Sequence, residues 1–235
     1  MTNLSRARWP ELGSVDVVLV PLGSTEQHGP HLPFNTDTVI ARAVAEGTSA
    51  HLMAAGVGVV VAPAIPFGSS GEHQDFAGTI SIGNEVLRAV VLEVSRSVQT
   101  WAPRIVFVNG HGGNVPALNE VVSQLIREEH DAVWVPCGVP GQDAHAGREE
   151  TSLMLHLAPT SVREELAEVG STADLANMIA DLRARGVRAV SSNGVLGDPT
   201  GASAHEGQRL LATMVASVTS RVESLWPELV RDSAD

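Results

Sequence analysis

With 235 residues and 43% hydrophobic side chains, the chain can bury a sizeable core, so its composition excludes an intrinsically disordered protein. The formal net charge of −12 argues against non-specific binding to nucleic acid or anionic membranes. The single cysteine, Cys137, excludes an intramolecular disulfide and is typical of a reducing cytoplasm. No secretion signal opens the chain and no run approaches 18 apolar residues, so we expect a cytoplasmic protein without membrane spans.

Short apolar runs alternate with amphipathic segments along the chain. The apolar runs predict buried strands at Val17–Val20, Val57–Ala62, Arg104–Val108 and Ala132–Val135, with a shorter strand at Val187–Val190 and a short strand or strand-like entry at Thr79–Ile82. Apolar residues at helical spacing predict helices at Thr38–Ala55, Asn84–Trp101, Val115–His130, Thr172–Gly186 and Gly207–Leu225, and one that begins between Gly147 and Thr151. This alternation predicts one domain over residues 1–235, an α/β fold in the form of a three-layer α/β/α sandwich with a mostly parallel sheet.

The loop after the first strand contains several side chains that commonly bind metals. Glu26, His28 and His31 follow the strand closely, and Asp37 (which, like Thr36, is placed to cap the next helix) lies further on. Glycine and proline residues allow the chain to turn and bring these groups together. Ligands of open α/β sheets bind beyond the carboxyl ends of the strands, and this carboxylate and imidazole set suits zinc, manganese or iron. The alternative interpretation is an ordinary polar loop.

Two later segments supply further candidates. His111 follows the third strand in the sequence NGHGGN, where Asn114 can cap the next helix; the alternative is a tight glycine turn with a bystander histidine. Near the start of a later helix, His145 and Glu150 stand five residues apart, and spacing alone does not choose between Glu150 and Glu149. His145 has a pKa suited to a general acid/base.

Two glycine-rich loops complete the candidate site. Residues 66–83 contain Glu72, His73 and Asp75, and we interpret this segment as a substrate-binding loop, the alternative being a plain connection. Residues 191–206 form a second loop that could border the site.

Together the candidates predict one or two divalent metal ions per chain (Zn, Fe(II) or Mn), with two sites if Asp37 bridges them. The candidate ligands are Glu26, His28, Asp37, His111 and Glu150. Such a pair polarises a carbonyl and activates water, which indicates hydrolysis. P-loop, G-x-G-x-x-G and G-x-S-x-G motifs are absent, which weakens nucleotide-cofactor and serine-hydrolase interpretations.

Three ordered motifs, LGSTEQHGPHLPFNTD, FVNGHGGN and HAGREETSLML, resemble the creatininase family of metal-dependent amidohydrolases over residues 17 to about 157. The resemblance implies an α/β/α sandwich, a homo-oligomer (a hexamer or similar), the same five metal ligands with Asp37 bridging, and His145 as a catalytic histidine. The loop FGSSGEHQDFAGTISIG and the segment PCGVPGQDAHAGREETSLMLHLAP are similar to the mycofactocin-system branch, whose members are peptidases. That branch implies a modified small precursor peptide as substrate and release of its C-terminal Val-Tyr-derived core.

The chain departs from creatininase proper at two positions. Gly113 stands where creatininase has a glutamate near the metal and water, and Gly141 stands where it has a tryptophan against its ring substrate. Creatinine hydrolysis is therefore disfavoured. Two alternatives to the peptidase stay open, namely an amidohydrolase of small cyclic amides or formamides and a non-catalytic metal-binding pathway protein.

Overall fold

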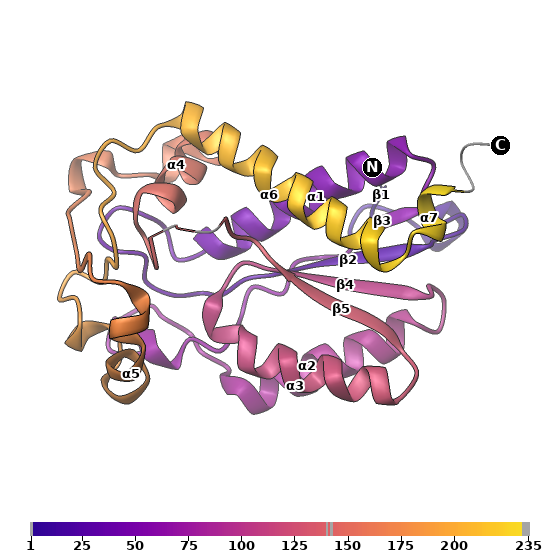
Figure 1. Cartoon of the computed structure of the whole chain (residues 1–235), viewed down its shortest axis with the longest axis horizontal. Helices are drawn as coiled ribbons and strands as arrows, with labels where there is room; N and C mark the ends of the chain where they lie inside the picture. The colour runs from indigo at the N-terminus through magenta and orange to yellow at the C-terminus, as the bar shows by residue number, and fades with distance from the viewer. Residues whose placement is uncertain (1, 140, 142, 232–235) are drawn as a thin grey trace.

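The computed structural model describes residues 2–139, 141 and 143–231, and a five-stranded sheet lies at their centre (Figure 1). The strand order is β1-β3-β2-β4-β5, and every pairing is parallel. The strands are β1 (Thr2–Asn3), β2 (Val17–Leu22), β3 (Val59–Val61), β4 (Arg104–Asn109) and β5 (Asp131–Pro136). Helices cover both faces of this sheet, so the predicted α/β/α sandwich is confirmed.

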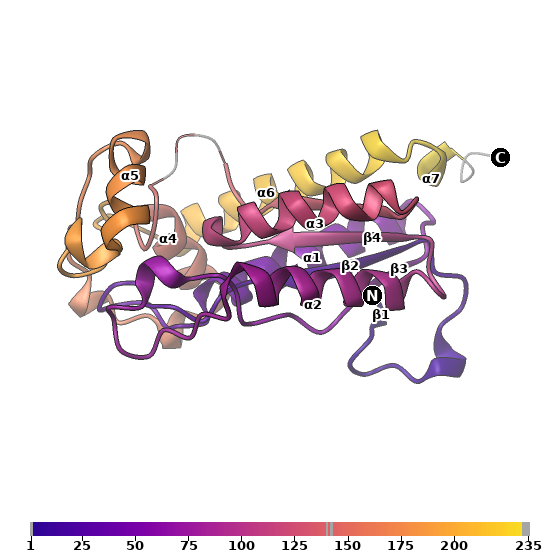
Figure 2. The ribbon, with the colours of Figure 1, turned by 90° about the horizontal axis from the view of Figure 1, so that it is seen from below.

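The helices form one layer on each face of the sheet (Figures 1 and 2). On one face, α1, α4 and α6 pack against one another, and α2 pairs with α3 on the other. The helices are α1 (Thr36–Ala54), α2 (Gly83–Val98), α3 (Val115–Arg127), α4 (Arg148–Leu157), α5 (Leu175–Arg185), α6 (Ala204–Leu225) and α7 (Glu228–Arg231). Beyond one end of the sheet lies α5, which contacts the 3-10 turn η2 (Gly71–His73).

Strand β2 shows why the central strands consist almost entirely of apolar residues. Val17 and Leu19 pack in the core under α1, α4 and α6, whereas Val18 and Val20 pack in the core under α2 and α3. Because successive side chains point to opposite faces and both faces are covered, both sets must be apolar. An alternating pattern of polar and apolar residues would bury polar groups in one of these cores.

The parallel register places three strand ends at one edge of the sheet. Leu22 pairs with Asn109, and Asn109 pairs with Pro136. The loops that follow β2, β4 and β5 therefore start at the same level. This is the geometric reason that residues far apart in sequence meet in one site.

Several local predictions are wrong. Val187–Ala189 forms a 3-10 turn instead of a strand, because this short apolar run packs in a small cluster with Met178 and Leu182 of α5 rather than joining the sheet. The run Thr79–Ile82 makes only an isolated bridge, between Ile80 and Thr25. Strand β1 lies in the polar N-terminal segment, where its two residues gave no apolar pattern to detect.

Two predicted helix caps are also wrong. Helix α1 begins at Thr36 after Asn35, and neither Thr36 nor Asp37 caps it, since both are already helical. Asn114 does precede α3, but its side chain bonds to other loops instead of capping the helix. At α6, Ser203 accepts a hydrogen bond from the Glu206 amide and starts the helix at Ala204, three residues before the predicted position.

Candidate metal centre

The loop after β2 turns back so that Glu26, His28 and Asp37 face one another. Gly29 helps this turn with a φ of +65°, a conformation that other residues rarely adopt. His28 Nε2 lies 2.9 Å from Asp37 Oδ1, and His28 Nδ1 lies 3.1 Å from the backbone oxygen of Glu26. A hydrogen bond from Nδ1 to that oxygen directs the lone pair of Nε2 toward the carboxylates.

His111 reaches the same carboxylates from the end of β4. Its Nδ1 lies 3.1 Å from Glu26 Oε1 and 3.5 Å from Asp37 Oδ2. Its other nitrogen, Nε2, lies 3.1 Å from the backbone oxygen of Ser69. When Nε2 donates a hydrogen to Ser69, the Nδ1 lone pair faces the two carboxylates, as a metal ligand requires.

The third segment brings His145 and Glu150 to the cluster. His145 Nε2 lies 2.7 Å from the backbone oxygen of Gln27, and its Nδ1 lies 3.7 Å from Glu26 Oε1. Glu150 Oε2 lies 3.8 Å from His28 Nε2 and accepts a hydrogen bond from the Ala146 amide at 2.6 Å.

Glu149, the neighbour that spacing left as an alternative to Glu150, lies elsewhere. Its carboxylate accepts a hydrogen bond from the Asp143 amide instead of approaching the cluster. The helical geometry at the start of α4 turns the two adjacent side chains in different directions. Glu150 is therefore the member of this pair that the structure brings to the cluster.

The two candidate residues in the loop of residues 66–83, Glu72 and His73, differ in burial and in the groups that they contact. His73 is buried, with Nε2 3.3 Å from Glu26 Oε1 and Nδ1 accepting a hydrogen bond from Gln27 Nε2 at 2.8 Å. Glu72 is partly exposed, and its Oε1 lies 3.5 Å from His111 Nε2. Substrate binding by either residue stays a prediction. Asp75, in the same loop, is exposed. The loop of residues 191–206 borders the cluster, because the Gly194 backbone oxygen accepts a hydrogen bond from the Gln27 side chain.

The donors form three overlapping groups, in each of which the ligand atoms lie within 4.8 Å of one another. These groups are Glu26–Asp37–His111, His28–Asp37–Glu150 and Glu26–His28–His145. Among the described residues, neither carboxylate oxygen of Glu26 nor Asp37 Oδ2 has a hydrogen-bond partner, although all three atoms are buried. Buried carboxylate oxygens without partners are costly, and a shared cation removes that cost. The donor set therefore fits a divalent metal.

Electrostatics within the cluster favour positive charge at its centre. Burial lowers the pKa of His28, but the carboxylates of Asp37, Glu150 and Glu26, Asp37 foremost, together outweigh burial and raise it to about 10. Burial likewise opposes charge on His111, yet Glu26 raises the pKa of His111 well above its usual value. Burial would raise the pKa of Glu26, but the surrounding imidazoles, His111 foremost, hold it well below its usual range. Burial raises the pKa of Asp37 to about 6 against the attraction of His28.

Two residues that organise the cluster were missed in the sequence. The Gln27 side chain accepts a hydrogen bond from the Gly29 amide and donates to His73 and Gly194. The Asn114 side chain bonds to Asn109 Oδ1, the Gly23 carbonyl and the Ser69 amide. For Gln27, the adjacency to Glu26 and His28 was an available signal. For Asn114, the sequence carried no hint beyond a helix cap.

Comparison with known protein families shows to which family the chain belongs. The family model described as "Creatininase: Creatinine amidohydrolase" matches residues 5–233. The chain belongs to the creatininase family. As a creatininase-family amidohydrolase, it is a hydrolase that acts on C–N bonds.

Two curated relatives represent different branches of the creatininase family. A "Mycofactocin precursor peptide peptidase" of Mycobacterium tuberculosis is 52% identical over 216 residues, covering 90% of this chain and 86% of the relative. A "2-amino-5-formylamino-6-ribosylaminopyrimidin-4(3H)-one 5'-monophosphate deformylase" of Methanothermobacter marburgensis is 32% identical over 225 residues, covering 89% and 90%.

Solved creatininase structures share the fold. A putative creatinine amidohydrolase of Bacteroides fragilis superposes with a TM-score of 0.82 at 22% identity, covering 98% of this chain and 96% of that one. A creatininase in its manganese form gives a TM-score of 0.78 at 23% identity, covering 96% and 99%. Another solved creatininase is a mutant of Zn–Zn type. Creatininases thus include manganese and zinc forms.

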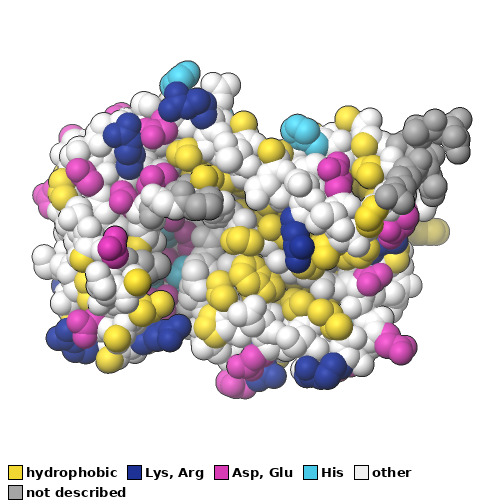
Figure 3. All heavy atoms as spheres, in the orientation of Figure 1, with side chains coloured by type: hydrophobic (Ala, Val, Ile, Leu, Met, Phe, Trp, Pro, Cys, Tyr) yellow, Lys and Arg dark blue, Asp and Glu magenta, His cyan; other side chains and the backbone are white. Residues whose placement is uncertain are grey.

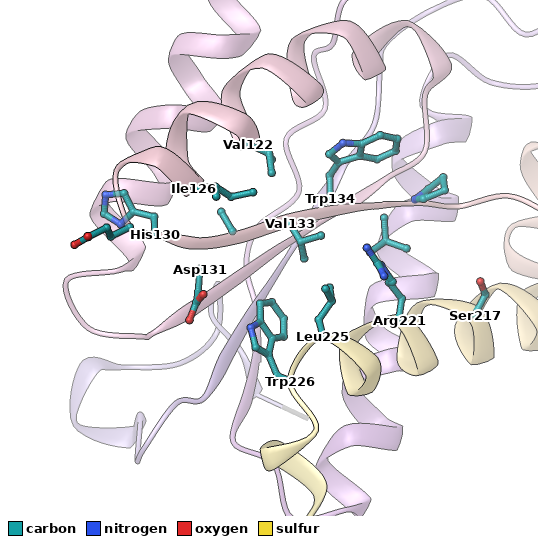
Figure 4. Close-up of a pocket in the computed structure, with 14 residues that line it drawn as sticks. Val122, Ile126, His130, Asp131, Val133, Trp134, Ser217, Arg221, Leu225 and Trp226 are labelled. Atoms are coloured by element: carbon teal, nitrogen blue, oxygen red, sulfur yellow. The ribbon is translucent and has the colours of Figure 1, made fainter.

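A second concave region of this creatininase-family chain lies along β5 (Figure 4). It is a groove of about 830 Å³ lined by β5, the end of α3 and the end of α6. Its apolar lining includes Ile126, Val133, Trp134 and Trp226. Figure 3 shows a band of hydrophobic side chains along the middle of the molecule, beside a hollow that contains histidine and acidic side chains. None of the three metal-ligand groups found among the described residues includes a residue of this groove, which we call the β5 groove.

Over the part of the chain that the structure describes, none of the helices combines the length and apolar character that a bilayer crossing requires.

Proposed function

We propose that this chain is a metal-dependent peptidase that cleaves a modified small precursor peptide, the mycofactocin precursor, and releases its C-terminal Val-Tyr-derived core. The observation that carries the proposal is the convergence of donors from three segments on buried carboxylate oxygens that accept no hydrogen bond from the described residues. The 52% identity to the mycobacterial peptidase over most of both chains supports the substrate class.

In this proposal the metals are one or two divalent ions, Zn, Fe(II) or Mn. Glu26, Asp37 and His111 hold one ion, and His28, Asp37 and Glu150 hold the other, with Asp37 common to both groups. When bound, the metal pair supplies a polarised amide carbonyl and a water of lowered pKa. The absence of thiolate among these ligands favours no single metal among the three.

His145 is the proposed general acid/base. Its Nε2 is engaged by the backbone oxygen of Gln27, so Nδ1 is the nitrogen that faces the cluster. Burial lowers the pKa of His145 to about 4, which keeps the ring neutral and able to accept a proton. Nδ1 takes a proton from the attacking water and returns it to the leaving amine of the peptide.

His145 also belongs to one of the three possible ligand groups, so its role needs a direct test. The variant His145→Gln should retain the metal content of the unsubstituted chain and lose roughly a hundredfold or more in turnover, the range of general acid–base catalysis. Loss of one metal per chain from this variant would make His145 a ligand instead.

The experiment that tests the function combines elemental analysis with a cleavage assay. The full chain, purified without added metal, is analysed for metal and then incubated with the modified precursor peptide. We expect one or two metals per chain and release of the C-terminal fragment, abolished by a chelator and restored by metal. Bound metal without cleavage would contradict the peptidase. Parallel assays with a formamide or cyclic amide test the other branch of the family, to which the deformylase relative belongs.

We further propose that the chain is cytoplasmic and assembles as a homo-oligomer, a hexamer or a similar assembly. The apolar lining of the β5 groove supports an interface there, since large exposed apolar patches are uncommon on monomers. Glu72 and His73 are the proposed substrate-binding residues of the loop of residues 66–83.

A further inference from the structure

The two nitrogens of His111 contact different groups. Nδ1 faces the carboxylates of Glu26 and Asp37 at 3.1 and 3.5 Å. On the opposite side of the ring, Nε2 lies 3.1 Å from the Ser69 backbone oxygen and 3.5 Å from Glu72 Oε1. The outer nitrogen of this ring therefore has two acceptors, one neutral and one negatively charged.

The 3-10 turn η2 connects this outer contact to the centre of the cluster. Its adjacent residues Glu72 and His73 approach His111 and Glu26 respectively. The segment just before this turn is anchored, because the Ser69 amide donates a hydrogen bond to Asn114 Oδ1 at 2.9 Å. The carboxylate of Glu72 is thus presented to His111 by an anchored segment.

Gly113 provides an independent indication that this outer contact is closely built. A Cβ at residue 113 would overlap both His111 Nε2 and the Ser69 backbone oxygen, and it would lie 2.6 Å from Glu72 Oε1. The three atoms that surround this position are the donor and the two acceptors of the outer contact. At the neighbouring Gly112, a Cβ would meet nothing within 4 Å. Of these two glycines, only Gly113 lacks room for a side chain.

We propose that Glu72 is a positioning residue for the metal ligand His111. Its carboxylate shares the Nε2 hydrogen with the Ser69 oxygen, fixes the tautomer that leaves Nδ1 free for the metal, and increases the basicity of the ring. Residue 113 is glycine because the contacting atoms of His111, Ser69 and Glu72 occupy the space that a side chain would need. The inference rests on the proposed metal site and deepens it, since it assigns Glu72 to the metal centre in addition to substrate binding.

The general behaviour of metal sites sets the expected size of the effect. Ligating histidines commonly donate their second N–H to a carboxylate or backbone oxygen, and losing such a partner weakens metal binding about 10–100-fold. Because the Ser69 oxygen remains as an acceptor, we expect the Glu72→Ala variant to weaken binding of one metal about tenfold. Glu72→Gln, which keeps an acceptor oxygen but loses the charge, should have a smaller effect.

The test measures metal affinity on the full chain by competition with a chelating indicator, and the visible absorption spectrum after loading with Co(II). Variants are Glu72→Ala, Glu72→Gln and Gly113→Ala. Matched controls are Asp75→Asn, which removes an exposed charge from the same loop, and Gly112→Ala, which adds a methyl group to the adjacent open position. We expect weaker binding and an altered Co(II) spectrum in Glu72→Ala and Gly113→Ala, with both controls unchanged.

Unchanged affinity and spectrum in Glu72→Ala would overturn the inference, even if Gly113→Ala fails to fold. Equal losses in Glu72→Ala and Asp75→Asn would overturn it too, because they would reflect charge alone. The proposed function fails differently, through an unsubstituted chain that binds no metal or does not cleave the peptide. The melting temperature of each metal-free variant checks that it is folded.

Discussion

The cluster at the carboxyl ends of the strands and the β5 groove are both concave, but they differ in chemistry. The cluster gathers buried carboxylates and imidazoles from three segments, whereas the groove has an apolar lining of aliphatic and indole side chains. The groove encloses about 830 Å³ but has no group of metal donors among the described residues. An open groove is therefore not sufficient to indicate a reactive site. We place the proposed chemistry at the cluster, where donors converge with incomplete hydrogen bonding.

The largest expected effect follows from Asp37, which belongs to two of the donor groups. Asp37→Asn should release metal and reduce peptide cleavage at least a thousandfold, or about 4 kcal/mol of transition-state stabilisation. Asp131→Asn removes an exposed carboxylate from the β5 groove and serves as the control. Metal analysis and initial rates measure both variants. Equal activity in the two would remove the distinction between the cluster and the groove.

A smaller effect separates two neighbouring carboxylates at the start of α4. Glu150→Gln should weaken metal binding and slow cleavage about 10–100-fold, because Glu150 lies 3.8 Å from His28 Nε2. Glu149→Gln should change neither, since that carboxylate bonds to the Asp143 amide. Chelator competition and rates with the modified peptide compare the pair. A larger loss in Glu149→Gln would reassign the ligand.

The β5 groove should affect assembly and leave catalysis intact. Ile126 lines this groove with 61% of its surface exposed, so Ile126→Glu should lower the molecular mass in solution. Val169→Glu introduces the same change at an exposed aliphatic residue outside the groove and should leave the mass unchanged. Light scattering after size-exclusion chromatography measures the mass. A monomeric unsubstituted chain would rule out a homo-oligomer interface in the groove.

The fold was predictable because the central strands carry continuous apolar runs. Val17–Val20 predicted a strand covered on both faces, and the structure confirms this. The predictions that failed concern short segments. Val187–Ala189 has an apolar run too short to distinguish a strand from a 3-10 turn, and β1 has only two residues.

The donors that the structure brings together were predictable from the sequence, and their arrangement was less so. Strand ends with Glu26 and His111 pointed to one edge of a parallel sheet, but spacing could not choose Glu150 over Glu149. The departure at Gly113 was visible in the sequence as a missing side chain. That the Glu72 carboxylate lies against that position depends on a contact between residues 41 positions apart, which no local pattern encodes.

The smallest expected effect concerns His31, a buried histidine beside the cluster. Its Nε2 contacts the Thr151 hydroxyl at 2.9 Å, and Nδ1 has no partner among the described residues. Burial lowers the pKa of His31 from 6.5 to about 4. Between these values the unfolded chain binds more protons than the folded one, so the stability that neutral His31 preserves above pH 6.5 is lost as the pH falls toward 4.

His31→Gln removes this titration and keeps a side-chain nitrogen within reach of Thr151. In the metal-free chain, the unsubstituted protein should lose about 1–2 kcal/mol more stability than the variant between pH 7 and pH 5. Urea unfolding at each pH, with a chelator present, gives the slope of the unfolding free energy against pH for each protein. His51→Gln, which removes an exposed histidine from α1, is the control. Parallel slopes for His31→Gln and the unsubstituted chain would mean that burial does not lower the pKa of His31 in the folded protein.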